Sequence, residues 1–354
     1  MASRRFKWTA AGSAVAAIGL AVVGYNLIAA QAQGLLAPAP LNNQVTTPPA
    51  FIMAVDDSGS MTFQTQFPGM DGEGCWNTTR RSFFDANGQL YTSGNCDYFY
   101  VLPGTRINNY YGIPPIDSLG FARSAQYNPT YFNPTVKYEP WINGSGASYG
   151  DANTGNTRID PRNGDTVALA SDYYSTAGAD SFRMQTGMVI PAGTFYRYGN
   201  RNYQYNYDVT WADGAQTVYM QYWPATFFVK WTSDTDAYPQ MEGATNTYNG
   251  VARTKVSNAC GTNCAMWKYT IAANNTAALQ NFANWYSYYG NPNRAMIAGM
   301  TRSLADFNNL RVGYFRINQN GSYDSGTNAN KRLTMRDMAV AADKQSLYTD
   351  MIAL

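Results

Sequence analysis

Histidine is absent from this chain of 354 residues. Its absence excludes Ser–His and Cys–His catalysis and excludes imidazole as a metal ligand. Charge is also scarce, because Asp, Glu, Lys and Arg make up only 14% of the residues and leave a formal net charge of +2. With no excess of either sign, we expect no nucleic-acid partner. An enzyme of this composition would depend on carboxylates, Lys, Tyr or a metal alone, and we predict that the protein is not an enzyme.

Long apolar runs are missing except near the amino terminus, where small apolar residues extend from about Thr9 to Val23. Basic residues precede this run, and Ala30-Gln31-Ala32 follows it as a small-residue cleavage site. This pattern predicts a signal peptide over residues 1–32, an exported protein and no membrane span after cleavage. An uncleaved amino-terminal anchor is the alternative, although the run is short for a span. Residues 33–49 are rich in proline and predict a linker.

Cysteine is rare but even in number: Cys75, Cys96, Cys260 and Cys264. Four cysteines in an exported chain predict disulfides and allow three pairings. Proximity in the sequence favours Cys75–Cys96 and Cys260–Cys264. A Cys₄ zinc site is the alternative. It is disfavoured because exported thiols oxidise and the spacings lack paired CxxC motifs.

The most informative segment that is present covers residues 50–61. An apolar run, predicted as a buried strand, ends in the sequence Asp56-Asp57-Ser58-Gly59-Ser60. The spacing places the Asp56 carboxylate and the hydroxyls of Ser58 and Ser60 within five residues. Hard cations take such oxygen ligands, so we predict a divalent-cation site, with Mg²⁺ favoured over Ca²⁺ or Mn²⁺.

Two qualifications belong to this motif. Asp57 would lie on the opposite side of an extended backbone from Asp56, so we expect it to support the site or to face solvent. The alternative to a metal site is an ordinary Asp/Ser/Gly turn that closes a strand.

Residues 62–275 are rich in Gly, Asn, Tyr and Thr and predict an insertion of β-strands and loops. The clearest strand-like runs cover residues 188–190, 193–198, 217–222 and 226–231. Aromatic and polar residues alternate over Tyr196–Tyr207. This alternation fits a sugar-binding face or a half-buried strand pair, and the second interpretation is favoured because alternation requires only one buried face.

Residues 276–354 show helical periodicity again. One helix carries Leu279, Phe282, Ala283 and Tyr286, and Gly290-Asn291-Pro292 then interrupts it. Asn291 as N-cap and Pro292 as first residue predict a second helix. Its apolar stripe is expected to contain Met296, Ile297, Met300, Leu304 and Phe307. A central parallel strand over 310–317, an edge strand within 331–338 and a last helix from Asp343 complete the prediction.

The order strand, metal turn, insertion, helix, strand, strand and helix predicts an α/β fold. Residues 50–61 and 276–354 would form part of a doubly wound sheet, interrupted by the β-rich insertion over 62–275. The metal turn would lie at the carboxyl end of the first strand, where such sheets bind ligands.

The motif Val55–Met61 resembles the metal-ion-dependent adhesion site of von Willebrand factor A domains. The chain as a whole resembles the PilC/PilY family of type IV pilus tip-associated adhesins over roughly residues 50–320. The segments that carry this resemblance are Val55–Met61, Ala125–Pro129, Tyr138–Trp141, Tyr222–Phe227, Asn281–Tyr289 and Leu310–Tyr314.

The resemblance implies a pilus-tip factor that supports pilus assembly, surface attachment and twitching motility. Its implied partners are pilin or minor pilins and a host or abiotic surface receptor, and its implied location is the periplasm, the outer membrane surface or the pilus tip. It also implies a calcium-binding propeller and the loops that supply a Thr and an Asp to the metal site. Both are expected beyond residue 354, so the chain is expected to be a truncated product or part of a longer protein.

Two other functions remain open from the sequence. A purely structural, disulfide-clamped module would bind no metal. A secreted glycan hydrolase would need a pair of carboxylates, for which the polar loops offer Asp165, Asp172, Asp213 and Glu242. Nothing in the sequence pairs these acids at a working separation.

Overall fold

The structure is a computed structural model. The predicted signal peptide and nearly all of the predicted linker lie outside the residues that it describes. The described ranges are residues 48–69, 72–100, 111–174, 181–235, 247–318 and 333–354. Among the helices in these ranges, none has the length and apolarity that crossing a membrane requires. Residues 50–354 form one compact unit.

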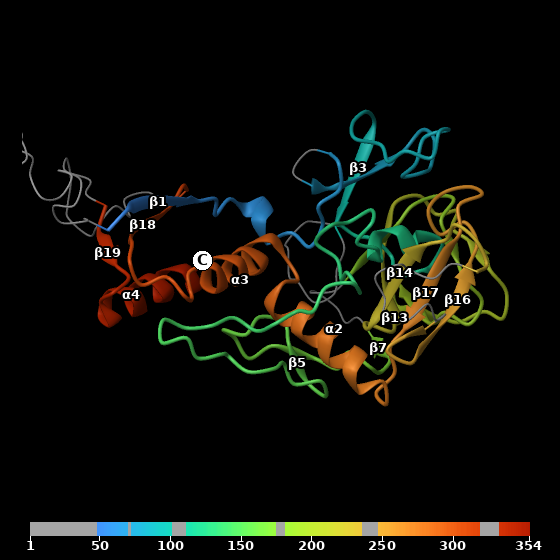
Figure 1. Cartoon of the computed structure of the whole chain (residues 1–354). Helices are drawn as coiled ribbons and strands as arrows, with labels where there is room; N and C mark the ends of the chain where they lie inside the picture. The colour runs from blue at the N-terminus through green and yellow to red at the C-terminus, as the bar shows by residue number, and fades with distance from the viewer. Residues whose placement is uncertain (1–47, 70–71, 101–110, 175–180, 236–246, 319–332) are drawn as a thin grey trace, which may run out of the picture. The chain divides into compact units, whose positions relative to one another are not determined.

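A three-stranded sheet joins the two ends of this unit (Figure 1). Its strands are β1 (Ala50–Val55), β18 (Arg311–Arg316) and β19 (Met335–Asp337), in the order β1-β18-β19. β1 and β18 are parallel and in register from Ala50↔Arg311 to Val55↔Arg316, whereas β19 is antiparallel to β18. The predicted central strand therefore lies between two neighbours. The strand before the turn was predicted to be buried, but β1 is an edge strand of this sheet, and its Phe51 and Ile52 are 40% and 60% exposed.

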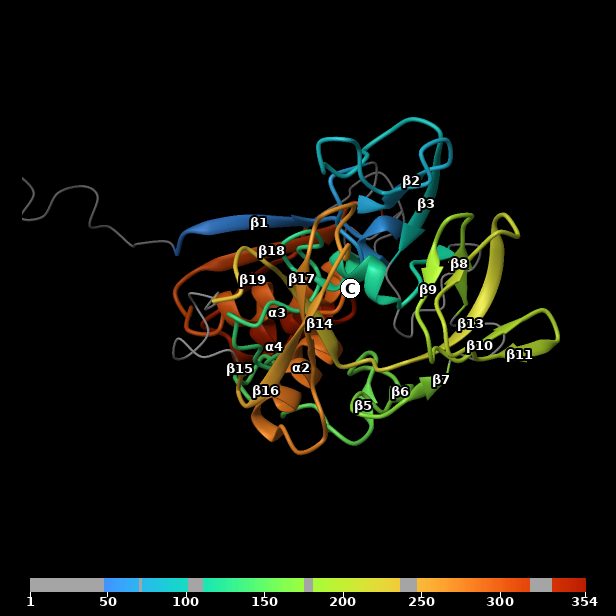
Figure 2. The same ribbon diagram turned by 90° about the vertical axis from the view of Figure 1, so that its right-hand side faces the viewer.

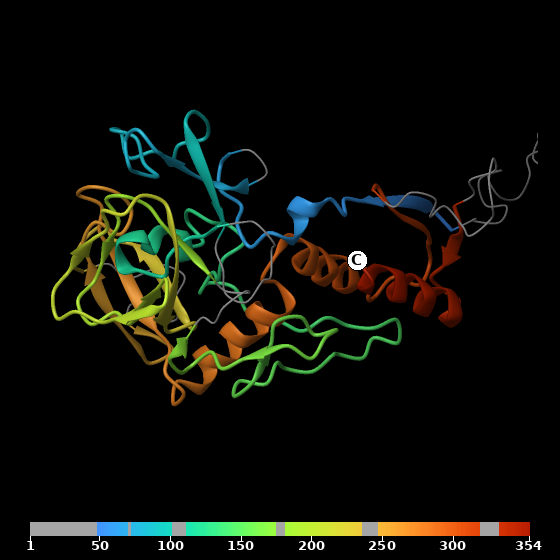
Figure 3. The same ribbon diagram turned by 180° about the vertical axis from the view of Figure 1, so that it is seen from behind.

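Two helices, α3 (Pro292–Ser303) and α4 (Ala341–Ile352), lie on one face of this sheet (Figures 1 and 3). α3 begins as predicted, because the Asn291 side chain accepts a hydrogen bond from the Arg294 amide. Pro292 suits the first position of the helix, because a residue there has no hydrogen-bond acceptor within the helix and proline has no N–H to leave unpaired. The smaller core forms between the helices and the sheet. Its members include Val55, Ile297, Met300, Leu304, Val312, Tyr314, Leu347, Tyr348 and Met351.

The prediction is wrong for one residue of the apolar stripe of α3. Phe307 is 52% exposed, because α3 ends at Ser303 and the helical register no longer carries the side chain toward the core. Met296 packs at the edge of the smaller core, and the other three stripe residues are buried.

The middle of the chain forms several small sheets (Figure 2). One follows the path β11-β10-β13-β8-β4-β3-β2, with β7 also paired to β13, and another has the order β14-β17-β16-β15. Two further pairs are β12-β9 and β5-β6. The bounds are β2 (Gly74–Asn77), β3 (Cys96–Tyr100), β4 (Tyr111–Gly112), β5 (Thr157–Arg158), β6 (Thr166–Val167), β7 (Tyr173–Tyr174), β8 (Phe182–Met184), β9 (Val189–Ile190), β10 (Tyr196–Tyr198), β11 (Arg201–Tyr203), β12 (Val209–Thr210), β13 (Gln216–Tyr222), β14 (Thr226–Lys230), β15 (Thr247–Tyr248), β16 (Val251–Val256) and β17 (Met266–Thr270).

The larger core of these sheets is aromatic. The Phe132 ring lies 5.2 Å from the Phe227 ring and 4.9 Å from the Phe282 ring, measured between centroids. Phe282 belongs to α2 (Thr276–Tyr288), whose apolar face is buried in this core. The expected boundary placed α2 with the sheet of β1. In the structure most of α2 packs with the insertion, and the chain reaches the smaller core at the last residue of α2, Tyr288.

The tyrosine-rich tract over 196–207 folds as a strand pair, β10 with β11. The rings of Tyr196 and Tyr203 stack at 5.2 Å, and Tyr196 is buried against Trp211. The alternation therefore has one buried face, which is the interpretation that the sequence favoured. Overall the chain has a mixed α/β fold built from several small sheets.

The two cores are joined at the break between α2 and α3. The Trp141 indole N–H donates to the carbonyl oxygens of Tyr288 (3.0 Å) and Arg294 (3.1 Å). The Arg294 guanidinium is buried and donates to the carbonyls of Tyr286 (2.8 Å), Ser287 (3.1 Å) and Ile159. Carbonyls at the end of a helix have no partner within the helix, so these side chains satisfy groups that the break would leave unpaired.

Candidate metal centre

The predicted site residues lie in the turn that follows β1. β1 ends at Val55, and only one turn of 3₁₀ helix, η2 (Gly59–Thr62), follows. Asp56 is exposed, and Ser58 and Ser60 are half-buried. The side chains are therefore held by the turn while remaining open to solvent.

The turn brings the hydroxyls of Ser58 and Ser60 together and holds the Asp56 carboxylate against the backbone of Ser58. The Ser58 amide donates to Asp56 Oδ1 at 2.8 Å, and the hydroxyl oxygens of Ser58 and Ser60 are 3.1 Å apart. The first contact is the local hydrogen bond that Asp side chains commonly make two residues on in turns. The two hydroxyls are therefore adjacent, and the carboxylate is fixed on the backbone between Asp56 and Ser58.

Asp57 connects this turn to the neighbouring strand. Its carboxylate is half-buried, and Oδ1 accepts a hydrogen bond from the Asn318 amide at 2.7 Å, just beyond the end of β18. The Ile317 amide also donates to the Val55 carbonyl at 2.8 Å. Asp57 thus links the carboxyl ends of the two parallel strands, and its support of a metal site stays a prediction.

The side-chain oxygens of this turn are of the chemical type that binds a hard divalent cation. It contains one carboxylate and two hydroxyls, and Mg²⁺ commonly binds through one or two carboxylates while retaining several waters. In the part of the chain that the structure describes, no group of three or more Cys, Asp or Glu side chains gathers in a way that could hold a metal. A cation at this turn would therefore depend on the two hydroxyls and on ligands from water or from another molecule.

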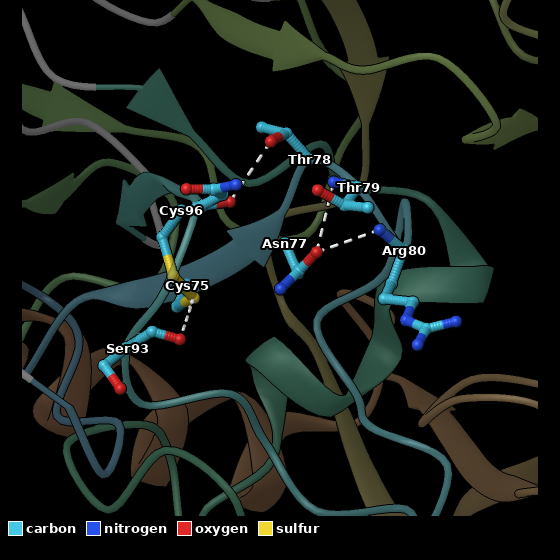
Figure 4. Close-up of a disulfide and its surroundings, with 8 residues drawn as sticks. Cys75, Asn77, Thr78, Thr79, Arg80, Ser93 and Cys96 are labelled. Carbon is cyan, nitrogen blue, oxygen red and sulfur yellow. Dashed lines mark hydrogen bonds between the residues drawn. A yellow bond between two sulfur atoms is a disulfide. The ribbon is translucent and has the colours of Figure 1, made fainter.

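The cysteines form two disulfides, Cys75–Cys96 and Cys260–Cys264, which are the pairings that proximity favoured. Figure 4 shows the first of them joining β2 to β3, with Asn77 accepting hydrogen bonds from the amides of the following turn. No cysteine remains free. The zinc alternative is therefore wrong for this structure, because all four sulfurs are used in disulfide bonds.

The acids considered for a hydrolase come from separate places. Asp165 lies in the turn between β5 and β6, and Asp213 lies in the turn before β13. Asp172 is exposed beside β7 and lines a cavity with Asp117. Glu242 lies outside the described residues. Asp172 thus borders a cavity in the part of the chain that the structure describes.

Sequence reasoning did not single out Arg123, which lines the same cavity at the end of η4 (Asp117–Arg123). A signal was present, because this arginine directly follows the apolar segment Leu119–Ala122, whose residues are all buried. A charged residue inside an apolar segment is unusual enough to examine.

The sequence was compared with protein-family profiles, with curated proteins and with solved structures, and none of them matches it.

Proposed function

We propose that the protein is a type IV pilus tip-associated adhesin and assembly factor that binds its partners through a divalent cation. The cation is held by Asp56, Ser58 and Ser60, with Mg²⁺ favoured. A carboxylate from a pilin, or from a host or abiotic surface, enters the open positions of the metal. The proposal extends the sequence resemblance, and it places the protein outside the cytoplasm.

One observation carries this proposal. An exposed carboxylate and two adjacent, half-buried hydroxyls lie in one turn at the carboxyl end of β1, next to the end of a parallel strand. Ligands of open α/β sheets bind in this position. An ordinary turn would need neither the second hydroxyl nor the carboxylate link from Asp57 to the neighbouring strand.

The arrangement of elements supports the same proposal. The order β1-β18-β19, with two strands parallel and the third antiparallel, and with α3 and α4 on one face, is compatible with one half of a von Willebrand factor A-like sheet. The helix that should follow the metal turn in such a domain is separated from it by the insertion. The amino end of α3 nevertheless lies beside η2, where the Asn291 side-chain amide donates to the Thr62 carbonyl at 3.4 Å.

Calorimetric titration with Mg²⁺, Ca²⁺ and Mn²⁺ tests the metal site. We expect Asp56→Ala and Ser60→Ala each to weaken cation binding by at least about tenfold, since each removes a ligand and tenfold is only about 1.4 kcal/mol. Asp57→Asn is the matched control, because the amide oxygen can still accept from Asn318 and no proposed ligand is lost. Thermal unfolding of each variant shows that the fold is kept.

Binding to carboxylated and to hydroxylated beads tests the partner chemistry. We expect adhesion to carboxylated beads in Mg²⁺, and loss of adhesion in a chelator or in Asp56→Ala. Adhesion that is unchanged by both the chelator and the substitution would contradict metal-dependent binding. The protein would then be a structural module of the pilus or cell surface.

A further inference from the structure

A cavity of about 490 Å³ lies between η4, the β14–β17 pair and the turn that follows β9. Its volume falls within the range of small-molecule sites in proteins. The lining mixes polar groups with apolar ones. The side chains important here are Asp117, Arg123, Asp172, Gln221, Trp223 and Lys268.

Arg123 is the unusual member of this lining. It is 8% exposed, and its guanidinium carbon lies 5.2 Å from the centre of the Tyr222 ring. Among the described residues its side chain has no hydrogen bond and no ion pair, and Nη2 is buried without an acceptor. A buried charge without a partner is costly, and buried charges in proteins are normally paired.

The comparison with Arg294 shows how this protein otherwise handles a buried arginine. Arg294 is 2% exposed, and its guanidinium donates to three backbone carbonyls. Arg123 has a similar burial but none of these acceptors, and it borders a cavity whereas Arg294 fills a helix break. A ligand in the cavity would supply the missing acceptor.

The rest of the lining narrows the chemistry of this ligand. Lys268 is already paired with Asp117 at 2.7 Å, so Arg123 is the cation that remains for an anion. The Trp223 indole is fixed by its N–H, which donates to the Ile271 carbonyl at 2.9 Å, and it supplies an apolar wall. Amide and carboxylate side chains such as Gln221 and Asp172 supply hydrogen-bonding groups for hydroxyls.

We infer that this cavity binds a carboxylated sugar, with the carboxylate on Arg123, the ring against Trp223 and the hydroxyls on the polar side chains. A planar guanidinium suits a carboxylate because it can donate two parallel hydrogen bonds. The inference does not depend on the metal turn, and it assigns the chain a second, metal-independent contact with acidic polysaccharide.

Calorimetry and saturation-transfer NMR with glucuronate and galacturonate test the inference, with glucose and acetate as reference ligands. We expect a uronate to bind, and glucose and acetate to bind at least about tenfold more weakly, because each lacks one half of the recognised chemistry. Arg123→Met should weaken uronate binding by at least about tenfold, and Arg123→Lys should weaken it less, since lysine keeps the charge but not the planar pair of donors.

Arg253→Met is the matched control. This arginine also lies over an aromatic ring, at 3.9 Å from Trp267, but it does not line the cavity. Without ligand, Arg123→Met should unfold at the wild-type temperature or above it, because an unpaired buried charge is removed. Asp56→Ala should leave uronate binding unchanged, so that failure of the metal proposal is distinguishable from failure of this one.

Three results would overturn the inference. Glucose or acetate binding as tightly as the uronates would remove the carboxylated sugar as the ligand class. Uronate binding that survives Arg123→Met would place the ligand elsewhere. A melting temperature that falls further in Arg123→Met than in Arg253→Met would make Arg123 a packing residue.

Discussion

Replacement of Arg294 by methionine tests how the break between α2 and α3 is stabilised. Methionine retains much of the length of the side chain but has no hydrogen-bond donor. The carbonyls of Ile159, Tyr286 and Ser287 would each lose a donor. A buried polar group left without a partner costs about 1–3 kcal/mol, so the three together cost roughly 3–9 kcal/mol.

A second effect opposes this loss. Burial of the Arg294 guanidinium disfavours its charged form and lowers its pKa to about 10. Removal of the charge recovers that cost, which amounts to several kcal/mol for a buried ion. We therefore expect Arg294→Met to lower the free energy of unfolding by about 3 kcal/mol. For a unit of this size the loss corresponds to about 5 °C in melting temperature.

Urea unfolding followed by tryptophan fluorescence, with the disulfides intact, measures this change. Arg123→Met is the control, because it removes another buried arginine, one that has no acceptor among the described residues. An unfolding free energy of Arg294→Met within about 0.5 kcal/mol of the wild type would refute the reasoning, since that is the range of substitutions that disturb nothing specific.

Three further predictions concern stability. Cys75→Ala with Cys96→Ala opens a loop with a sequence separation of 21, and we expect guanidinium unfolding to show a loss of about 3 kcal/mol. The other disulfide spans only 4 residues and should contribute about 2 kcal/mol, so equal losses would contradict the loop-entropy argument. Burial raises the pKa of Tyr131 from 10.0 to about 12, so the stability from its neutral form is complete below pH 10 and is lost as the pH rises toward 12. Tyrosinate absorbance measured alongside unfolding at each pH checks this, and ionisation near pH 10 without unfolding would contradict it. Gly144→Ala would place a Cβ atom 2.5 Å from the backbone of Gln345 in α4, and we expect thermal unfolding to show a cost of about 1–3 kcal/mol. A wild-type melting temperature would show that α4 moves away freely.

Local chemistry made some elements predictable from the sequence. α3 begins at Pro292 because the N-cap side chain of Asn291 and the fixed backbone of proline act within a few residues. β1 and β18 were predicted as strands because each is a continuous apolar run, although only β18 has the burial that such a run predicts. The turn after β1 was predictable for the same reason, since Asp56, Ser58 and Ser60 lie within five residues, and the cation at this turn stays a prediction.

Long-range contacts explain the rest. The apolar face of α2 has the same periodicity in either core, and only the packing of Phe282 against Phe132 shows that it belongs to the insertion. The cavity at Arg123 is built from several separate segments, and no sequence spacing brings them together. Phe307 shows a related limit, because the boundaries of helices are harder to predict from sequence than their existence.

The pairing of β1 with β18 has a consequence for the order of assembly. Ala50 and its partner Arg311 lie about 260 residues apart, and closing a flexible loop of that length costs about 5 kcal/mol in chain entropy. We expect the larger, aromatic core to fold first, because it brings the distant ends of the chain close together before β1 and β18 pair. Substitutions in the larger core would then prevent the turn at Asp56 from forming, although most residues of that core lie far from the turn in the sequence.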